Sequence, residues 1–314
     1  MHWLLPFAAP ASDAGRQALR ALVLPTLAGL IARAAPPGPD DRDEADELSF
    51  SPPHERALAR LVELAGGDGT LPWAAWLAER DGLAPGDQAW GLLTPAHWQL
   101  GTDTMTMADP AALQLAEDES RALLAAVHDL FASEGLLLVW GAPLRWYLAH
   151  ESLAALRTAS ADRVIGRSVD AWVDRGPAAR LWRRLHSEAQ MRLHEHPVNA
   201  AREARGLPAV NALWLSGCGI WQPTAWPPGL VVDERLRGPA LAEDWAAWSA
   251  AWQALDAGPL AELAAAFGPV ALTLCGERVA LTLHLDGKGP LRTWVARTLG
   301  RWRQPAPAAL LETL

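Results

Sequence analysis

The spacing of apolar residues along the chain predicts strands that alternate with helices. The opening segment 1–9 is short and apolar and predicts a first strand. Over 12–34 the apolar residues recur at helical spacing, with Ser12 placed to cap the helix and Pro25 expected to kink or divide it. Further helices are expected over 53–65, 71–80, 117–133, 178–194, 242–255 and 291–302, and strands over 90–100, 136–140, 212–215, 270–275 and 278–285. This order predicts an α/β fold in which helices flank a mixed or mostly parallel sheet.

Segment 35–47 interrupts this pattern with prolines, a glycine and six acidic residues among its thirteen, and predicts a mobile surface loop. No internal repeat of fixed period is found. A chain of 314 residues exceeds the usual size of one domain, although large α/β folds reach this length as a unit. We therefore expect a single α/β domain over 1–314, with room for an inserted α+β portion at about 85–210.

Composition narrows the class of protein. Half of the residues are apolar and a fifth are charged, and no apolar run is long enough to cross a bilayer. The first residues lack the basic start of a secretory signal, and Pro6 breaks their apolar run. The two cysteines, Cys218 and Cys275, are too few for a disulfide framework and suit a reducing compartment. A soluble cytoplasmic protein without a membrane contact is expected.

Net charge argues against nucleic acid as a partner, because a formal charge of −9 gives an acidic overall field. One stretch departs from this balance. Segment 157–205 carries ten arginines, namely Arg157, Arg163, Arg167, Arg175, Arg180, Arg183, Arg184, Arg192, Arg202 and Arg205. A small anionic ligand is expected to bind there.

A Gly-x-Gly pattern after the strand at 212–215 is the second feature that suggests an anion. In Ser216-Gly217-Cys218-Gly219 the glycines would allow the main chain to approach a ligand and present N–H groups to it; a tight turn is the alternative. The predicted ligand-binding set consists of Arg163, Arg167, Arg205, Asn211, Ser216, Gly217 and Gly219. For the arginines, ion pairs with Asp162, Asp170 and Glu203 are the competing explanation.

His186, Gln190 and His194 lie at four-residue steps on the helix expected over 178–194, and His196 follows. This spacing suggests either a metal site or capping of the helix end, and the pattern lacks the Glu of a His-Glu-x-x-His helix. No metal and no cofactor are therefore predicted. An enzyme would instead need Ser216 or Cys218 as nucleophile beside one of these histidines.

Tryptophan is unusually frequent, with 17 residues. Trp245, Trp248 and Trp252 lie at helical spacing, which predicts a core or an interface. Tryptophans left exposed would mark a surface for a protein partner.

Several motifs carry a resemblance to a known family. They are His2-Trp3-Leu4-Leu5-Pro6-Phe7, Leu93-Thr94-Pro95-Ala96-His97-Trp98, the segment 159–167, His196-Pro197-Val198-Asn199, the segment 202–211, Trp214-Leu215-Ser216-Gly217-Cys218-Gly219 and Leu272-Thr273-Leu274-Cys275-Gly276-Glu277. Together they resemble bacterial proteins known as RpfE-type regulatory proteins or as phosphoglycerate-mutase-like proteins. The resemblance extends over most of the chain.

Segment 205–219 is similar, more distantly, to cofactor-independent phosphoglycerate mutases of the archaeal type. This resemblance implies an alkaline-phosphatase-like fold, and in that family a Ser nucleophile acts between two divalent metals held by Asp and His. Here Phe7-Ala8-Ala9 stands where the family places an Asp ligand, and no Asp-x-x-x-His or Asp-His cluster is found. The metal site is therefore not carried over.

Three functions remain open. The first is a catalytically degenerate phosphoglycerate-mutase-like protein with a regulatory or anion-binding role, and this is the prediction. The second is an enzyme, with or without a metal, that acts on a phosphorylated or carboxylated small molecule. The third is a structural protein whose Trp-rich face docks a protein partner.

Overall fold

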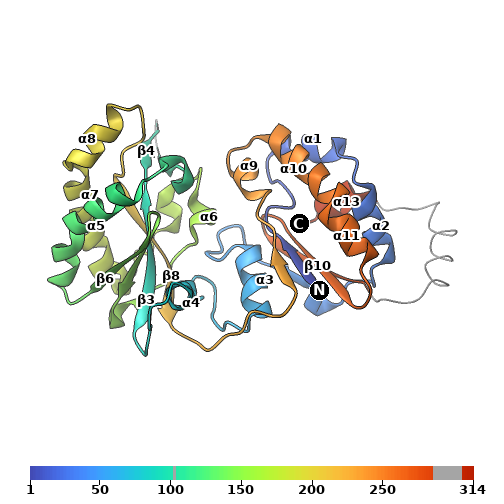
Figure 1. Cartoon of the computed structure of the whole chain (residues 1–314), viewed down its shortest axis with the longest axis horizontal. Coiled ribbons are helices and arrows are strands. Elements are labelled where there is room, and N and C mark those ends of the chain that lie inside the picture. Colours follow the sequence, from blue (N-terminus) through green and yellow to red (C-terminus); the bar gives the residue numbers. More distant parts are fainter. Residues whose placement is uncertain (102–103, 286–305) are drawn as a thin grey trace. The chain divides into compact units, whose positions relative to one another are not determined.

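The computed structural model describes residues 1–101, 104–285 and 306–314 (Figure 1). These residues pack into two compact units: unit 1 comprises 1–47, 52–62 and 225–314, and unit 2 comprises 48–51 and 63–224. The portion expected as an insertion, about 85–210, falls within the range of unit 2, and the division into one domain with an insertion stays a prediction. The helix expected over 291–302 lies outside the described residues.

Unit 1 is built on a mixed five-stranded sheet. Its strands lie in the order β2 (Arg42–Glu44), β11 (Val279–Leu285), β10 (Val270–Cys275), β1 (His2–Leu5) and β9 (Leu230–Val232). β1 runs parallel to both of its neighbours, whereas β10 and β11 form the antiparallel hairpin that the sequence predicts. The expectation of a mixed sheet is therefore confirmed for this unit.

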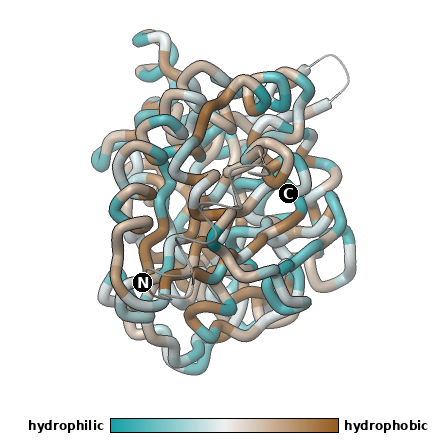
Figure 2. The backbone as a smooth tube through the Cα atoms, turned by 90° about the vertical axis from the view of Figure 1, so that its right-hand side faces the viewer, coloured by the Kyte–Doolittle hydropathy of each residue, from teal (hydrophilic) through white to brown (hydrophobic). Residues whose placement is uncertain are grey.

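Helices cover both faces of this sheet. Leu5, Leu272 and Leu274 share one apolar cluster with residues of the helices on the first face, and Leu4 and Ala280 pack with α3 (Pro53–Leu61) on the other. The helices that contribute to the first cluster are α1 (Asp13–Ala21), α2 (Pro25–Arg33), α10 (Trp245–Ala257), α11 (Pro259–Ala265) and α13 (Pro307–Leu311), and the short α9 (Arg237–Leu241) precedes α10. In Figure 2 hydrophobic stretches of the chain run between more hydrophilic turns, as this layering requires.

Two local predictions for unit 1 have different outcomes. The helix expected over 12–34 is divided at Pro25 into α1 and α2, as predicted, and Ser12 caps α1 by accepting a hydrogen bond of 3.1 Å from the N–H of Gly15. The mobile loop expected over 35–47 is wrong for part of its length. It contains a short helix, η1 (Pro39–Asp41), and β2, which pairs with β11. The acidic composition hid this strand, because edge strands carry charged residues.

Unit 2 contains a four-stranded antiparallel sheet in the order β6 (Leu137–Ala142), β7 (Arg145–Ala149), β3 (Ala89–Ala96) and β8 (Ala212–Ile220). On one face it packs against α5 (Glu117–Ala132) and α7 (Arg180–His194), and on the other against α4 (Trp73–Arg80). A small hairpin of β4 (Trp98–Leu100) and β5 (Met105–Met107) and the helix α8 (Pro197–Glu203) complete the larger elements. The remaining short helices are η2 (Pro110–Leu113), η3 (Glu151–Leu153), α6 (Ala161–Val164), η4 (Val169–Trp172) and η5 (Pro177–Ala179).

The 216–219 segment is not a loop after a strand, as the sequence predicts, but part of β8. Ser216 pairs with Leu92, and the ladder is irregular where Gly217 follows. Gly217 has φ +63°, and a Cβ there would lie 3.0 Å from both the backbone nitrogen of Ala74 and Cβ of Trp73. A Cβ on Gly219 would lie 2.8 Å from Cβ of Pro72. The glycines thus allow β8 to pass close to the start of α4.

Within the three described ranges, no helix is long and apolar enough to cross a membrane.

Candidate functional site

A cavity of about 500 Å³ lies in unit 2. Its wall comes from β4, α7, β8 and the segment between Leu156 and Ala179. The residues that give the wall its character are Trp98, Trp172, Trp182, Arg183, His186 and Trp214. A volume of this size is within the range of small-molecule sites.

Helix α7 supplies the polar side of the wall. Leu185, Ala189 and Leu193 are buried in the core of unit 2 and form one apolar face of the helix that the sequence predicts. Arg183, His186, Ser187 and Gln190 line the cavity instead, and they lie about one helical turn apart on a neighbouring face. An amphipathic helix thus packs one face in the core and places the other at the cavity.

Asn211 fixes the position of Trp98. The backbone N–H of Trp98 donates to Oδ1 of Asn211 at 2.7 Å, and Nδ2 of Asn211 donates to the carbonyl oxygen of Trp98 at 2.9 Å. Trp214, on β8, donates its indole N–H to the carbonyl of Ala159 at 2.9 Å. Asn211 therefore acts on the cavity through Trp98, as a positioning residue.

Aromatic rings are in contact along the wall. The ring centroid of His186 lies 4.9 Å from that of Trp98 and 5.4 Å from that of Trp182, and Trp98 lies 6.3 Å from Trp214. Nε1 of Trp98 and Nε2 of His186 are buried without a hydrogen-bond partner in the part of the chain that the structure describes. Burial lowers the pKa of His186 to about 4, so that the ring is neutral at pH 7.

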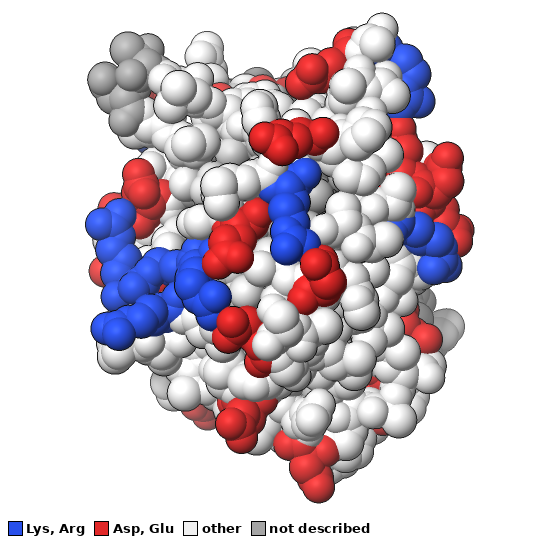
Figure 3. Space-filling view, turned by 90° about the vertical axis from the view of Figure 1, so that its left-hand side faces the viewer, with Lys and Arg blue, Asp and Glu red and all other residues white. Residues whose placement is uncertain are grey.

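Main-chain atoms hold the side chain of Arg183 in the cavity wall. Its Nη1 donates to the carbonyl oxygens of Asp174, at 3.0 Å, and Gly176, at 3.2 Å. Among the described residues it has no carboxylate partner within ion-pair distance, whereas Arg157 and Arg175 at the same cavity pair with Asp68 and Asp170. In Figure 3 Arg side chains gather on part of the surface, beside acidic ones. The charge of Arg183 is thus available to a ligand.

The arginines that the sequence singles out lie elsewhere in unit 2. Arg163 is 2% exposed, and its Nη2 donates to the hydroxyl of Ser49 at 2.9 Å. Arg167 follows α6 and is half-buried. Arg205 pairs with Glu119 rather than with Glu203. None of the three lines the cavity.

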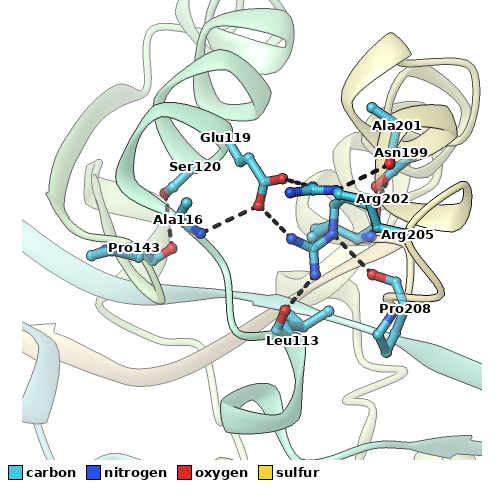
Figure 4. Close-up of polar contacts among 11 residues, drawn as sticks. Leu113, Ala116, Glu119, Ser120, Pro143, Asn199, Ala201, Arg202, Arg205 and Pro208 are labelled. Atoms are coloured by element: carbon cyan, nitrogen blue, oxygen red, sulfur yellow. Dashed lines mark hydrogen bonds and ion pairs between the residues drawn. The ribbon is translucent and has the colours of Figure 1, made fainter.

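Glu119 joins Arg205 to the fully buried Arg202 (Figure 4). Arg202 also donates to the carbonyl oxygens of Leu113 and Pro208, the latter at 3.0 Å. The pKa of Glu119 is lowered: burial alone would raise it, but hydrogen bonds from Arg205, the N–H of Ala116 and Arg202 outweigh that effect. This network ties η2, α5 and α8 together, which is a structural use of Arg202 and Arg205.

The residues considered for nucleophilic catalysis are not assembled at the cavity. His186 lines it, but Ser216 and Cys218 do not, and both are buried in β8. Burial raises the pKa of the Cys218 thiol to about 12, which disfavours a thiolate. His194 is exposed, and Nδ1 of His196 accepts a hydrogen bond from the N–H of Val198 and caps α8.

The end of β1 is enclosed by hydrogen bonds within the core of unit 1. Ala8 is fully buried, and its N–H donates to the carbonyl of Cys275 at 2.7 Å. The indole N–H groups of Trp248 and Trp252 donate to the carbonyl oxygens of Phe7, at 3.0 Å, and Ala8, at 3.2 Å. Within residues 1–101, 104–285 and 306–314 no group of three or more His, Cys, Asp or Glu side chains is placed to hold a metal ion.

Sequence reasoning missed most of the cavity. It included Arg183 in the basic stretch without singling it out, and it used Trp98 and Trp214 only within motifs of the resemblance. A usable signal was present at α7, where an Arg, a His and a Gln follow one face beside Trp182. Asn211 was selected, but its contact with Trp98 links residues 113 positions apart.

The two units define an α/β protein with a mixed sheet in unit 1 and an antiparallel sheet in unit 2, each packed against helices. No family model matches the sequence, and no curated protein matches it.

Two solved structures resemble the chain over most of its length. One is the cofactor-independent phosphoglycerate mutase from Thermoplasma acidophilum DSM 1728, with 14% identity over 91% of this chain and 89% of that chain, at a TM-score of 0.38. The other is the PH0037 protein from Pyrococcus horikoshii, with 13% identity over 91% of this chain and 87% of that chain, at a TM-score of 0.43. Because these sequence identities and TM-scores are low, the chemistry of the site is argued from the residues of this chain alone.

Proposed function

We propose that this protein binds a small organic anion in the cavity of unit 2 and does not carry out phosphoglycerate mutase chemistry. The observation that carries the proposal is the guanidinium of Arg183, which lines the cavity, is held by two carbonyl oxygens and has no carboxylate partner in the described part of the chain. A positive charge in a half-buried wall is stabilised by an anion, and an anion is therefore the ligand that this wall selects.

The rest of the wall indicates that the anion is organic. Small-molecule sites combine mostly apolar and aromatic lining with a few polar groups that orient the ligand. Here Trp98, Trp172, Trp182 and Trp214 supply the apolar surface. A bare inorganic anion would leave this surface without a partner.

The resemblance to RpfE-type and phosphoglycerate-mutase-like proteins supports the second half of the proposal. We infer an alkaline-phosphatase-like ancestry in which Phe7-Ala8-Ala9 replaced the metal-binding end of β1, so that the chain kept the fold and lost the metals. A regulatory role, in which ligand binding is the signal, follows from the same resemblance. The alternative of an enzyme with a Cys218 nucleophile has less support, because that thiol is buried in the core.

Isothermal titration calorimetry with a panel of small carboxylates and phosphates, 3-phosphoglycerate included, tests the proposal. At least one organic anion is expected to bind the wild type, and Arg183→Gln is expected to weaken it about tenfold or more, as a charge-assisted hydrogen bond is lost. The control is Arg184→Gln on the same helix, which removes a surface pair with Glu134 and does not touch the cavity.

Two results would contradict the proposal: equal binding by wild type and Arg183→Gln, or no binding by any member of the panel. A separate assay measures conversion of 3-phosphoglycerate to 2-phosphoglycerate with Mg²⁺ or Mn²⁺ present. No turnover is expected, and turnover above the level of a denatured sample would show that the chain retains the activity.

A further inference from the structure

The donor geometry of Arg183 indicates which kind of anion it binds. A guanidinium has five N–H donors in one plane. Both donors on Nη1 are directed to carbonyl oxygens, those of Asp174 and Gly176. What remains is the edge formed by Nε and Nη2, whose two parallel N–H groups match the two oxygens of a carboxylate.

This edge is not fully buried. Nε1 of Trp98 and Nε2 of His186 in the same wall are buried without a partner among the described residues, whereas Nε and Nη2 of Arg183 are not. Arg183 is half-buried, and it lines the cavity next to Trp182, its neighbour on α7. A ligand in the cavity therefore meets both a guanidinium and an indole.

Much of the cavity wall is aromatic. Trp98, Trp182 and Trp214 come from three different elements, and each lines the same space. His186, between Trp98 and Trp182, is neutral at pH 7 because burial lowers its pKa to about 4. The acidic residues of the lining, Asp170 and Asp174, are engaged with Arg175 and with the N–H of Gly176. The inner part of a ligand is therefore expected to be uncharged, and flat rings make the best contact with indole faces.

We propose that the ligand is a planar aromatic carboxylate, with its ring among Trp98, Trp182 and Trp214 and its carboxylate on the Nε and Nη2 edge of Arg183. This inference rests on the proposed function and names the chemical class of its ligand. An organic cation is a poor fit because the wall already carries Arg183, and a saturated acid gains less from the indole faces.

Calorimetry with matched probes tests the inference. The probes are 2-naphthoate, its neutral analogue 2-naphthamide, the saturated acid cyclohexanecarboxylate, and 3-phosphoglycerate as an anion without a ring. 2-Naphthoate is expected to bind at least about tenfold more tightly than each of the other three, since each of them lacks either the charge or the aromatic face.

Two variants separate the roles of the wall. Arg183→Lys keeps the charge but loses the planar edge, and it is expected to weaken 2-naphthoate about tenfold, while Arg184→Lys leaves binding unchanged. Trp182→Leu is expected to weaken 2-naphthoate and to leave cyclohexanecarboxylate nearly unaffected, because only the flat ring uses the indole face. Near-ultraviolet circular dichroism of each variant checks that the fold is retained.

The possible failures are distinguishable. If cyclohexanecarboxylate or 3-phosphoglycerate binds as tightly as 2-naphthoate and depends on Arg183, the proposed function stands and the aromatic class is wrong. If 2-naphthamide binds as tightly as 2-naphthoate, the Arg183 edge does not bind the carboxylate, and the inference fails. If no anion shows a dependence on Arg183, both the inference and the proposed function fail.

Discussion

Both units contain clustered tryptophans, but they use them differently. In unit 1, Trp248 and Trp252 are fully buried on α10, and each donates its indole N–H to a carbonyl at the end of β1. In unit 2, Trp98 and Trp182 are half-buried beside a cavity, and the indole N–H of Trp98 has no partner among the described residues. The difference shows that a run of tryptophans does not identify a site. Open space beside the rings distinguishes the two clusters, since the buried indole N–H of Trp3 in unit 1 also has no partner among the described residues.

The largest effect expected from this comparison is on stability. Trp252→Ala in unit 1 is expected to lower the free energy of unfolding by about 3–5 kcal/mol, because it leaves a cavity in the core and an unpaired carbonyl on Ala8. Trp182→Ala in unit 2 is expected to cost about 1–2 kcal/mol, since its ring already contacts solvent. Urea denaturation followed by far-ultraviolet circular dichroism measures both. Equal losses in the free energy of unfolding would show that the two tryptophan clusters contribute equally to stability.

The buried ion pair of unit 2 gives the second comparison, because no such pair occurs in the described core of unit 1. Arg202→Ala is expected to lower the free energy of unfolding by about 3–5 kcal/mol, since it removes the buried donor to Glu119 and leaves two carbonyl oxygens without theirs. The matched control is Arg205→Ala, which shares Glu119 but is about half exposed, and it is expected to cost about 1 kcal/mol or less. Urea denaturation again gives both values, and a loss of similar size in the two variants would contradict the assignment of Arg202 as the structural partner.

The same network makes unit 2 sensitive to acid. The pKa of Glu119 in the folded protein lies below its ordinary value of 4.5, so the unfolded chain binds a proton more readily at this residue. Its contribution to stability is present above pH 4.5 and is lost as the pH falls through the folded-state value. Thermal denaturation from neutral to acidic pH is expected to show a shallower decline for Glu119→Gln than for the wild type. The decline does not vanish, because the pKa values of Asp81 and Asp129 are lowered as well. Parallel curves would mean that Glu119 adds nothing to the acid sensitivity.

Much of the fold follows from the sequence. The helical spacing over 117–133 and 178–194 and the hairpin over 270–285 agree with α5, α7, β10 and β11, because each of these elements has one clearly apolar face. β2 was missed, since its Arg-Asp-Glu sequence contains no apolar residue and its pairing with β11 is decided by a strand more than 230 positions away. β8 was cut short at Leu215, since two glycines in a strand predict a loop unless the helix beside them is known.

The site could be predicted only in part. The arginine-rich stretch 157–205 contributes most of the cavity wall, and its role in anion binding stays a prediction. Which arginine is available to a ligand depends on long-range partners. Arg205 meets Glu119 and Arg163 meets Ser49, 86 and 114 positions away in sequence, whereas Arg183 has local carbonyl contacts only. Spacing along one helix does not contain this information. The seven residues of the predicted ligand-binding set stay a prediction.

The smallest expected effect is a change in the free energy of unfolding at His186, and its sign separates a binding role from a structural one. His186→Phe is expected to raise the free energy of unfolding by about 1 kcal/mol, because a ring of similar shape replaces a buried nitrogen that has no partner among the described residues. The control, His196→Phe, is expected to lower it by about 1 kcal/mol, since Nδ1 of His196 accepts the N–H of Val198 at the start of α8. Urea denaturation at pH 7 measures both variants. A gain at His186 means that the native protein keeps an unfavourable polar atom beside its cavity, as binding sites do. A loss there would mean that Nε2 already has a favourable partner, and the histidine would then be structural.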